Sequence, residues 1–193
     1  MSSKRIPFLI ALIGTVLTVS ATQPSTSANN ASNLAHKSAD KEFIAPEAGF
    51  TIKLPDKSDN LIILARDPRD QHITAGMRTW NLKQGEFIIT FTELNSGPDD
   101  QRLKQVMLSS HRNTTVSGLP AREGELLSEQ ALNLGEDPGW ELRARYPNDV
   151  LFIERIYCAN HRFYQITATL EGDQRKHEAE VIKILESFNV VAK

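Results

Sequence analysis

The side chains best able to do chemistry are spread along this sequence without the spacing that a metal or catalytic site requires. Its five histidines show no ligand pattern; they are His36, His72, His111, His161 and His177. One aspartate pair, Asp67 and Asp70, lacks the alternating oxygen ligands and the glycine of a calcium loop. The same is true of a second pair, Asp99 and Asp100. We therefore interpret both pairs as turn and helix-cap residues, and the sequence leaves any metal site undefined.

Known catalytic motifs are missing from the sequence as well. It has no Gly-x-Ser-x-Gly elbow, no P-loop, no dinucleotide-binding glycine pattern and no His-Glu-x-x-His pair. We expect a protein that is not an enzyme and that needs no cofactor. A hydrolytic enzyme with dispersed residues stays open as an alternative, because catalytic groups need only meet in space.

Cys158 is the only cysteine, which rules out an internal disulfide and any cysteine-based metal cluster. Its place in a predicted strand suits a small buried apolar side chain better than a nucleophile. Trp80 and Trp140 also fall in predicted strands, where core packing is the usual role of a tryptophan. We therefore assign all three residues to the core.

β-Strands must position these side chains. The alternation of apolar and polar residues that predicts strands begins with apolar Phe50, Ile52 and Leu54. The first half of the chain predicts strands at 50–54, 61–65, 73–82 and 86–94. The last two are joined by a Lys-Gln-Gly turn, and residues 95–98 end the hairpin. A helix is expected at 100–112, with Leu103 and Met107 on its apolar side.

The second half of the chain predicts a meander of strands followed by a helix. The expected strands are 126–134, 140–146, 150–158 and 163–170, with two-residue turns at 148–149 and 160–161. The last helix, at 174–188, carries one apolar stripe made of Val181, Ile184, Leu185 and Phe188. Such a stripe must cover a sheet. The fold class is therefore α+β: an open antiparallel sheet backed by helices, of the α/β/α type.

The two-residue turns fix which residues face each other in the meander. They predict Leu142 opposite Arg155 and Arg155 opposite Ile166, on a face that is otherwise apolar or aromatic. Glu141, Arg143 and Arg145 would then lie on the other face, with Arg143 opposite Glu154. Arg155 is thus the candidate binding residue, because a guanidinium on a core face needs a partner.

Two interpretations of Arg155 remain open from the sequence. In one, it forms an ion pair with Glu178 or Glu186 of the last helix, or its stem packs on Tyr157 while its head reaches water. In the other, Arg155 lines a pocket between sheet and helix and holds an anionic group of a ligand. Arg155→Met should alter stability in the first case and remove binding in the second.

The N-terminal segment has the layout of an export signal. Lys4 and Arg5 precede an apolar run at 6–19, and the small residues before Thr22 predict cleavage after Ala21. The run is shorter than a membrane span, and no cysteine near the cleavage point could carry a lipid. We expect export to the periplasm, the thylakoid lumen or the outside of the cell.

Residues 22–41 are rich in Ser, Thr, Asn and Ala, which predicts a disordered leader before a single domain at 42–193. The whole chain of 193 residues is 40% hydrophobic and 24% charged, with a formal net charge of -2. This balance is that of a soluble globular protein, without the basic excess that binds nucleic acid. We therefore exclude nucleic-acid partners.

Several stretches resemble the PsbP/Mog1-like fold family, which includes luminal proteins of photosystem II and exported bacterial relatives. They are 49–55 (GFTIKLP), 87–92 (FIITFT), and the block 139–172 followed by a helix that ends in 186–188 (ESF). The resemblance implies a binding or assembly role at a protein complex or membrane surface, with metal ions as accessories. It matches no metal ligand or partner contact of the family to a position in this chain.

The leading functional hypothesis is therefore an exported, non-enzymatic binding or assembly-factor module with a protein partner. The alternative is a domain that binds a small ligand or a metal ion, since a curved sheet backed by helices can hold a pocket. The dispersed hydrolytic enzyme is the third. The sequence leaves the oligomeric state open.

Overall fold

The computed structural model describes residues 41–55, 60–94 and 101–191. The expected signal peptide and nearly all of the expected leader lie outside these residues. So do His36, the turn at 95–98, and the pair Asp99 and Asp100.

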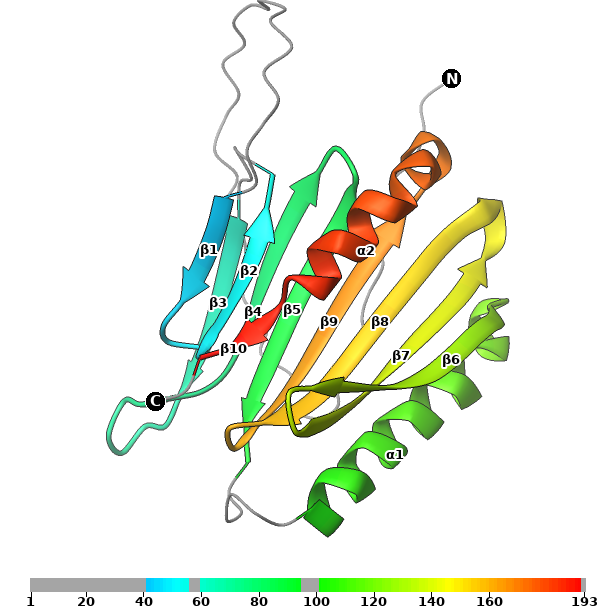
Figure 1. The fold of residues 1–193 in the computed structure, drawn as a ribbon. Helices are drawn as coiled ribbons and strands as arrows, with labels where there is room; N and C mark the ends of the chain where they lie inside the picture. The colour runs from blue at the N-terminus through cyan, green and yellow to red at the C-terminus, as the bar shows by residue number, and fades with distance from the viewer. Residues whose placement is uncertain (1–40, 56–59, 95–100, 192–193) are drawn as a thin grey trace, which may run out of the picture. The chain divides into compact units, whose positions relative to one another are not determined.

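A seven-stranded sheet forms the centre of the described domain, and all of its pairings are antiparallel (Figure 1). Its strand order is β3-β4-β5-β9-β8-β7-β6. The strands are β3 (Asn60–Arg66), β4 (Ile73–Leu82), β5 (Gly85–Glu93), β6 (Glu125–Leu134), β7 (Asp137–Tyr146), β8 (Val150–Ala159) and β9 (Arg162–Leu170). All of the strands predicted for this sheet are therefore present.

A second sheet of three short strands has the order β1-β2-β10. Its strands are β1 (Lys41–Ala45), β2 (Phe50–Leu54) and β10 (Asn189–Val190). Only β2 was predicted. This small sheet packs on the large one, since the ring of Phe43 lies 5.3 Å from that of Trp80 and Arg78 lies over the same Phe43 ring.

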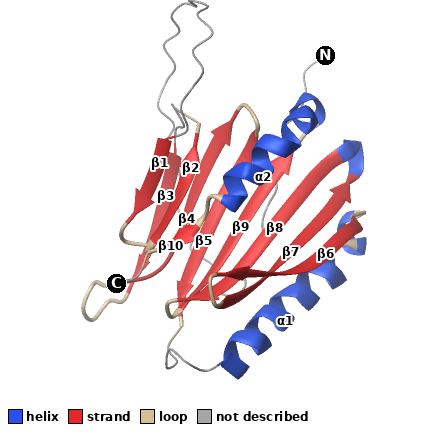
Figure 2. Cartoon of the chain, viewed as in Figure 1, coloured by secondary structure: helices blue, strands red, loops and turns tan. Residues whose placement is uncertain are grey.

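Two helices pack on opposite faces of the large sheet (Figure 2). Helix α1 (Gln101–Gly118) places Leu108 against Ile156 and Cys158, while α2 (Glu178–Glu186) packs on β2 and β9. Helix α1 runs longer than the predicted 100–112. Helix α2 starts later than predicted, because a 3-10 helix at Gly172–His177 precedes it. The architecture is thus the expected α+β arrangement of an antiparallel sheet between helices.

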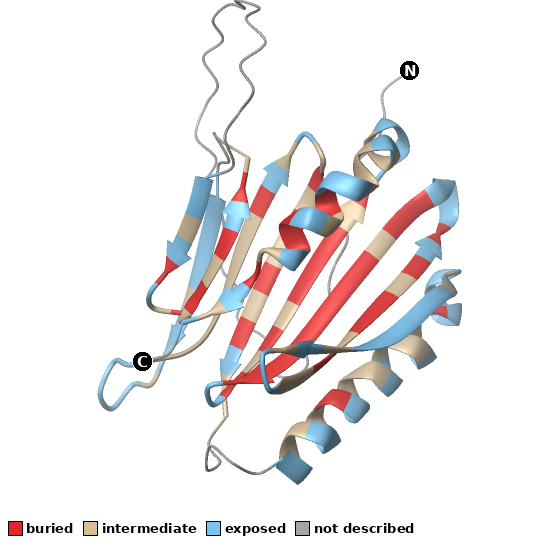
Figure 3. Cartoon of the chain, in the orientation of Figure 1, coloured by how far each residue is buried: buried red, intermediate tan, exposed pale blue. Residues whose placement is uncertain are grey.

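Apolar burial is concentrated on the α2 side of the sheet (Figure 3). Strand β8 is buried along almost its whole length, and buried residues predominate in β9. Phe188 lies in the middle of this core, with its ring stacked on Tyr157 and close to Phe50 and Tyr164. Smaller clusters fill the α1 side. Within the described ranges, no helix is both long and apolar enough to cross a bilayer.

One of the two predicted hairpin registers is confirmed and the other is wrong. Asn160 and His161 form the two-residue turn between β8 and β9, with φ values of 45° and 60°, so Arg155 does pair with Ile166. Between β7 and β8, however, the connection has three residues, Pro147–Asp149, and Tyr146 pairs with Val150. Pro147 has no N–H to donate to the ladder, so pairing stops one residue earlier than predicted.

Candidate functional site

The corrected register changes the surroundings of Arg155, because Arg155 pairs with Glu141 and not with Leu142. Glu141, Arg143 and Arg145 therefore share a face with Arg155, contrary to the prediction. The expected pairing of Arg143 with Glu154 is also wrong, since Arg143 lies opposite Ile153.

Arg155 is buried as expected, but its carboxylate partner lies on the neighbouring strand. Its Nε donates to Glu141 Oε2 at 2.7 Å, so neither Glu178 nor Glu186 of the last helix plays that part. The anion-pocket interpretation rested on the incorrect register and loses its basis here. What the structure shows at Arg155 is a buried cross-strand ion pair.

Glu141 is the centre of this polar cluster and is only 1% exposed. Its Oε1 accepts from Arg143 Nε at 2.8 Å and from Gln130 Nε2 at 3.1 Å. Burial alone would raise the pKa of Glu141, but the bonds from Arg155 and Arg143 outweigh burial, so the pKa is lowered. Glu141 is therefore ionised at neutral pH, and Arg143 links it to Glu178 on α2 at 3.4 Å.

A second buried carboxylate, Glu154, lies on the opposite face beneath α1 and is 1% exposed. Its Oε1 accepts from Gln165 Nε2 at 2.6 Å and lies 3.0 Å from His111 Nε2. Its Oε2 is buried without a partner among the described residues. No pattern in the sequence indicates that His111 and Glu154 meet, because they lie 43 positions apart along the chain. Together they tie α1 to the sheet.

The same face of the sheet has a different character on β3, β4 and β5, where it carries no ionisable side chain across three rows. The rows follow from the strand pairing and are Leu61-Thr79-Ile88, Ile63-Met77-Thr90 and Ala65-Ala75-Thr92. We call these nine residues the open face. Helix α1 packs on β7 and β8, and Leu61 and Ile63 remain 59% and 53% exposed. The uncharged run at 61–65 was visible in the sequence, but the side on which α1 packs was not.

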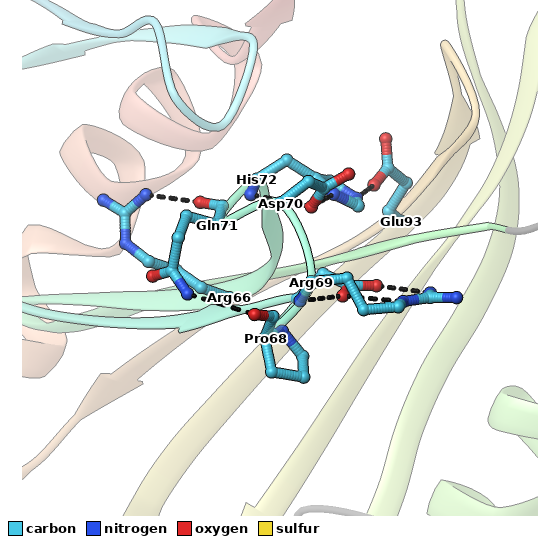
Figure 4. A network of polar contacts seen from close by, with 8 residues as sticks. Arg66, Pro68, Arg69, Asp70, Gln71, His72 and Glu93 are labelled. Carbon is cyan, nitrogen blue, oxygen red and sulfur yellow. Dashed lines mark hydrogen bonds and ion pairs between the residues drawn. The ribbon is translucent and has the colours of Figure 1, made fainter.

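The turn between β3 and β4 gathers the titratable groups of this end of the sheet (Figure 4). His72 Nδ1 lies 2.6 Å from Asp70 Oδ1, and its Nε2 lies 2.9 Å from Glu93 Oε2. The bond to Asp70, with a smaller contribution from Glu93, raises the pKa of His72. Ligand atoms of Asp67, Asp70 and His72 lie within 4.8 Å of one another.

This turn fits a divalent cation only after some exchange of partners. Imidazole and carboxylate ligands suit Zn²⁺ or Mn²⁺. Asp67, however, already accepts two side-chain bonds from Arg69, and both His72 nitrogens face carboxylates. A cation at His72 would therefore have to displace Asp70 or Glu93 from one of the ring nitrogens. As predicted, Asp67 and Asp70 are turn residues.

The remaining candidates from the sequence take structural places. Cys158 is fully buried, and burial raises the pKa of its thiol to about 11, which removes it as a nucleophile. Trp80 is buried in the main core, and Trp140 packs against the cluster under α1, so both belong to the core as expected. His161 is a turn residue, and His177 lies 3.2 Å from Glu180.

Comparison with solved structures identifies the fold, whereas no family model and no curated protein sequence matches the chain. The solution structure of cyanobacterial PsbP (CyanoP) from Synechocystis sp. PCC 6803 superposes with a TM-score of 0.56 at 9% identity, covering 83% of this chain and 98% of CyanoP. The Ran-binding protein Mog1p of Saccharomyces cerevisiae superposes with a TM-score of 0.41 at 12% identity, covering 80% of this chain and 97% of Mog1p. A putative regulator of unknown function from Pseudomonas aeruginosa superposes with a TM-score of 0.43 at 12% identity, with the same coverage of both chains. On the match to CyanoP, the chain has the PsbP/Mog1-like fold.

Proposed function

We propose that this chain is an exported, non-enzymatic binding module that docks on a partner protein through the open face. The observation that carries the proposal is the absence of any ionisable side chain from the three rows of that face, although it is partly exposed. A solvated sheet face is normally polar, and contiguous apolar surface marks sites of interaction. The signal-like N-terminal segment supports export.

The chemistry of the described residues supports binding over catalysis. Three of the buried ionisable groups, Glu141, Arg155 and Glu154, form bonds that hold strands and helix together. The likeness to CyanoP concerns the fold, and fold alone does not assign function. The open face is therefore the best candidate for the working surface.

Site-specific photo-crosslinking in the native host tests this proposal. A photoreactive residue at Met77 or Ile88, both on the open face, should give an adduct of one discrete mass with a protein of the same compartment. The matched control is Lys183, which is exposed on α2 on the other side of the sheet. Equal adducts from all three positions, or adducts from Lys183 alone, would contradict the proposal.

A second candidate function is cation binding at the β3–β4 turn, which the convergence of Asp67, Asp70 and His72 favours. Since the pKa of His72 is raised, a cation that binds a ring nitrogen of His72 must displace a proton. Zn²⁺ affinity should therefore rise with pH, by about tenfold per unit while His72 is mostly protonated, and level off above its pKa.

Calorimetric titration of the full chain with Zn²⁺ at several pH values measures this dependence. His72→Ala should abolish the pH-dependent binding, and His177→Ala, which removes another histidine–carboxylate pair, should leave it intact. Binding that is the same in His72→Ala, or that does not change with pH, would remove the turn as a cation site.

A further inference from the structure

The outer edge of β3 is an unprotected edge strand. Among the described residues β3 pairs only with β4, so every second residue of β3 directs its backbone N–H and C=O away from the sheet. Leu61, Ile62 and Ile63 are exposed, and no charge occurs from Leu61 to Ala65. Both faces of this strand are thus apolar at a free edge.

The opposite edge of the same sheet is more strongly protected than β3, whose pairing with β4 is regular from Asn60 to Ala65 and shifts only between Ala65 and Arg66. Strand β6 carries exposed Glu125, Glu129 and Gln130, and its pairing is interrupted by a bulge between Leu126 and Ser128. Charged side chains and bulges are the usual means of preventing edge-to-edge pairing. The chain therefore blocks association along β6 and leaves the uncharged, regularly paired stretch from Leu61 to Ala65 open on β3.

The exposed apolar surface at the β3 edge of the large sheet continues onto the small sheet β1-β2-β10. Strand β1 is the end strand of the small sheet, and its Ile44 is 58% exposed. Contacts of Phe43 with Trp80 and Arg78 place β1 over β4, and Figure 1 shows β1 on the β3 side of the domain. Four of the seven exposed large apolar side chains of the described residues lie on these two edge strands.

We propose that β3 pairs antiparallel with β3 of a second copy, about a two-fold axis through Ile63. In this register Leu61 faces Ala65, Ile62 faces Leu64, and Ile63 faces itself, so each apolar residue from Leu61 to Ala65 meets an apolar residue. The large side chain of Leu61 in each copy faces the small side chain of Ala65 in the other. The polar ends, Asn60 and Arg66, face each other without opposing like charges.

Other registers fit less well, which is why the axis is placed at Ile63. A shift of two residues in one direction sets Arg66 against Ile62, and a shift in the other sets Asn60 against Leu64. A two-fold axis at Ile63 also keeps both open faces on the same side, so the dimer carries one continuous uncharged surface. This self-association does not depend on the partner proposed above.

Sedimentation velocity of the full chain over a range of concentrations tests the proposal. The wild type should sediment with the mass of two chains, and Ile63→Lys, which sets two ammonium groups opposite each other, should lose the dimer. Leu127→Lys is the matched control, because Leu127 is exposed on the protected edge strand β6. A monomeric wild type, or a dimer that survives Ile63→Lys, overturns the proposal.

A thiol crosslink tests the register separately from the mass. Ile63→Cys should be joined to its counterpart by a short bifunctional crosslinker that reacts with thiols, because the two residues face each other at the axis. Ile62→Cys faces Leu64, so its counterpart lies diagonally and further away and should be joined in lower yield. The buried Cys158 supplies no background. Crosslinking of Ile62→Cys with equal yield would reject pairing at Ile63. These outcomes are distinct from adducts formed between Met77 and another protein.

Discussion

Glu141→Leu is expected to destabilise the protein by about 3–5 kcal/mol, because it leaves Arg155 charged and buried without its carboxylate. Arg155→Met should cost less, since Glu141 keeps its bonds from Arg143 and Gln130. The double variant Glu141→Leu, Arg155→Met should recover part of the loss. Urea denaturation of the three variants and the wild type measures these differences.

A surface pair of the same type provides the control for this experiment. Glu129 accepts from Arg112 across the α1 side, but both side chains are partly exposed. Glu129→Leu should therefore change stability by less than about 1 kcal/mol. If Glu141→Leu proved no more costly than Glu129→Leu, the buried pair would not be holding β7 to β8.

The lowered pKa of Glu141 also predicts the direction of a pH effect. A carboxyl whose pKa is lower in the folded state stabilises the fold above its unfolded pKa and loses that contribution as pH falls through the folded value. The difference in stability between wild type and Glu141→Leu should thus be largest near neutrality. It should narrow as the pH falls below 4.5, the ordinary value for this carboxyl.

Phe188→Ala is expected to cost about 3–5 kcal/mol, the usual range for emptying a buried aromatic site. Phe188 is buried, and its ring stacks on Tyr157 with centroids 5.8 Å apart and lies 5.5 Å from Phe50. It thus joins the small sheet to the large one. The midpoint of urea unfolding should fall without a change in slope.

Val191→Ala is the comparison for this variant, because Val191 lies three residues further on and is exposed. It should stay within about 0.5 kcal/mol of the wild type. A comparable loss in both variants would mean that the C-terminal segment as a whole, and not the aromatic contact, sets the stability.

The strands of the meander were predictable because apolar residues alternate along them, and the turn at Asn160 and His161 set one register correctly. Pro147 was a sequence signal against the other register, since proline cannot continue the ladder as a donor. Helix α1 continues past Arg112 to Gly118 in spite of the weak helix propensity of Asn113 and Thr114. Strand β10, two residues long, is too short to leave any periodic pattern.

The candidate surfaces were harder to predict than the fold. The burial of Arg155 followed from the register of the β8–β9 hairpin, which was predicted correctly. The partner of Arg155 depended on the register of the β7–β8 hairpin, which was not. The meeting of His111 with Glu154, and the exposure of Leu61 and Ile63 on the open face, depend on where α1 packs. That position is set by side chains from β7 and β8 acting together, and no local pattern in the sequence records it.

The three-residue connection Pro147–Asp149 constrains how sequences of this kind can diverge. If Pro147 joined the ladder opposite Val150, leaving Asn148 and Asp149 as a two-residue turn while β8 and β9 stay paired, β7 would turn over. Arg155 would then face Leu142, and Glu141 would move toward the apolar cluster around Ile156. Substitutions that let residue 147 pair with Val150 should therefore be accompanied by exchange of charged and apolar residues along the whole of β7.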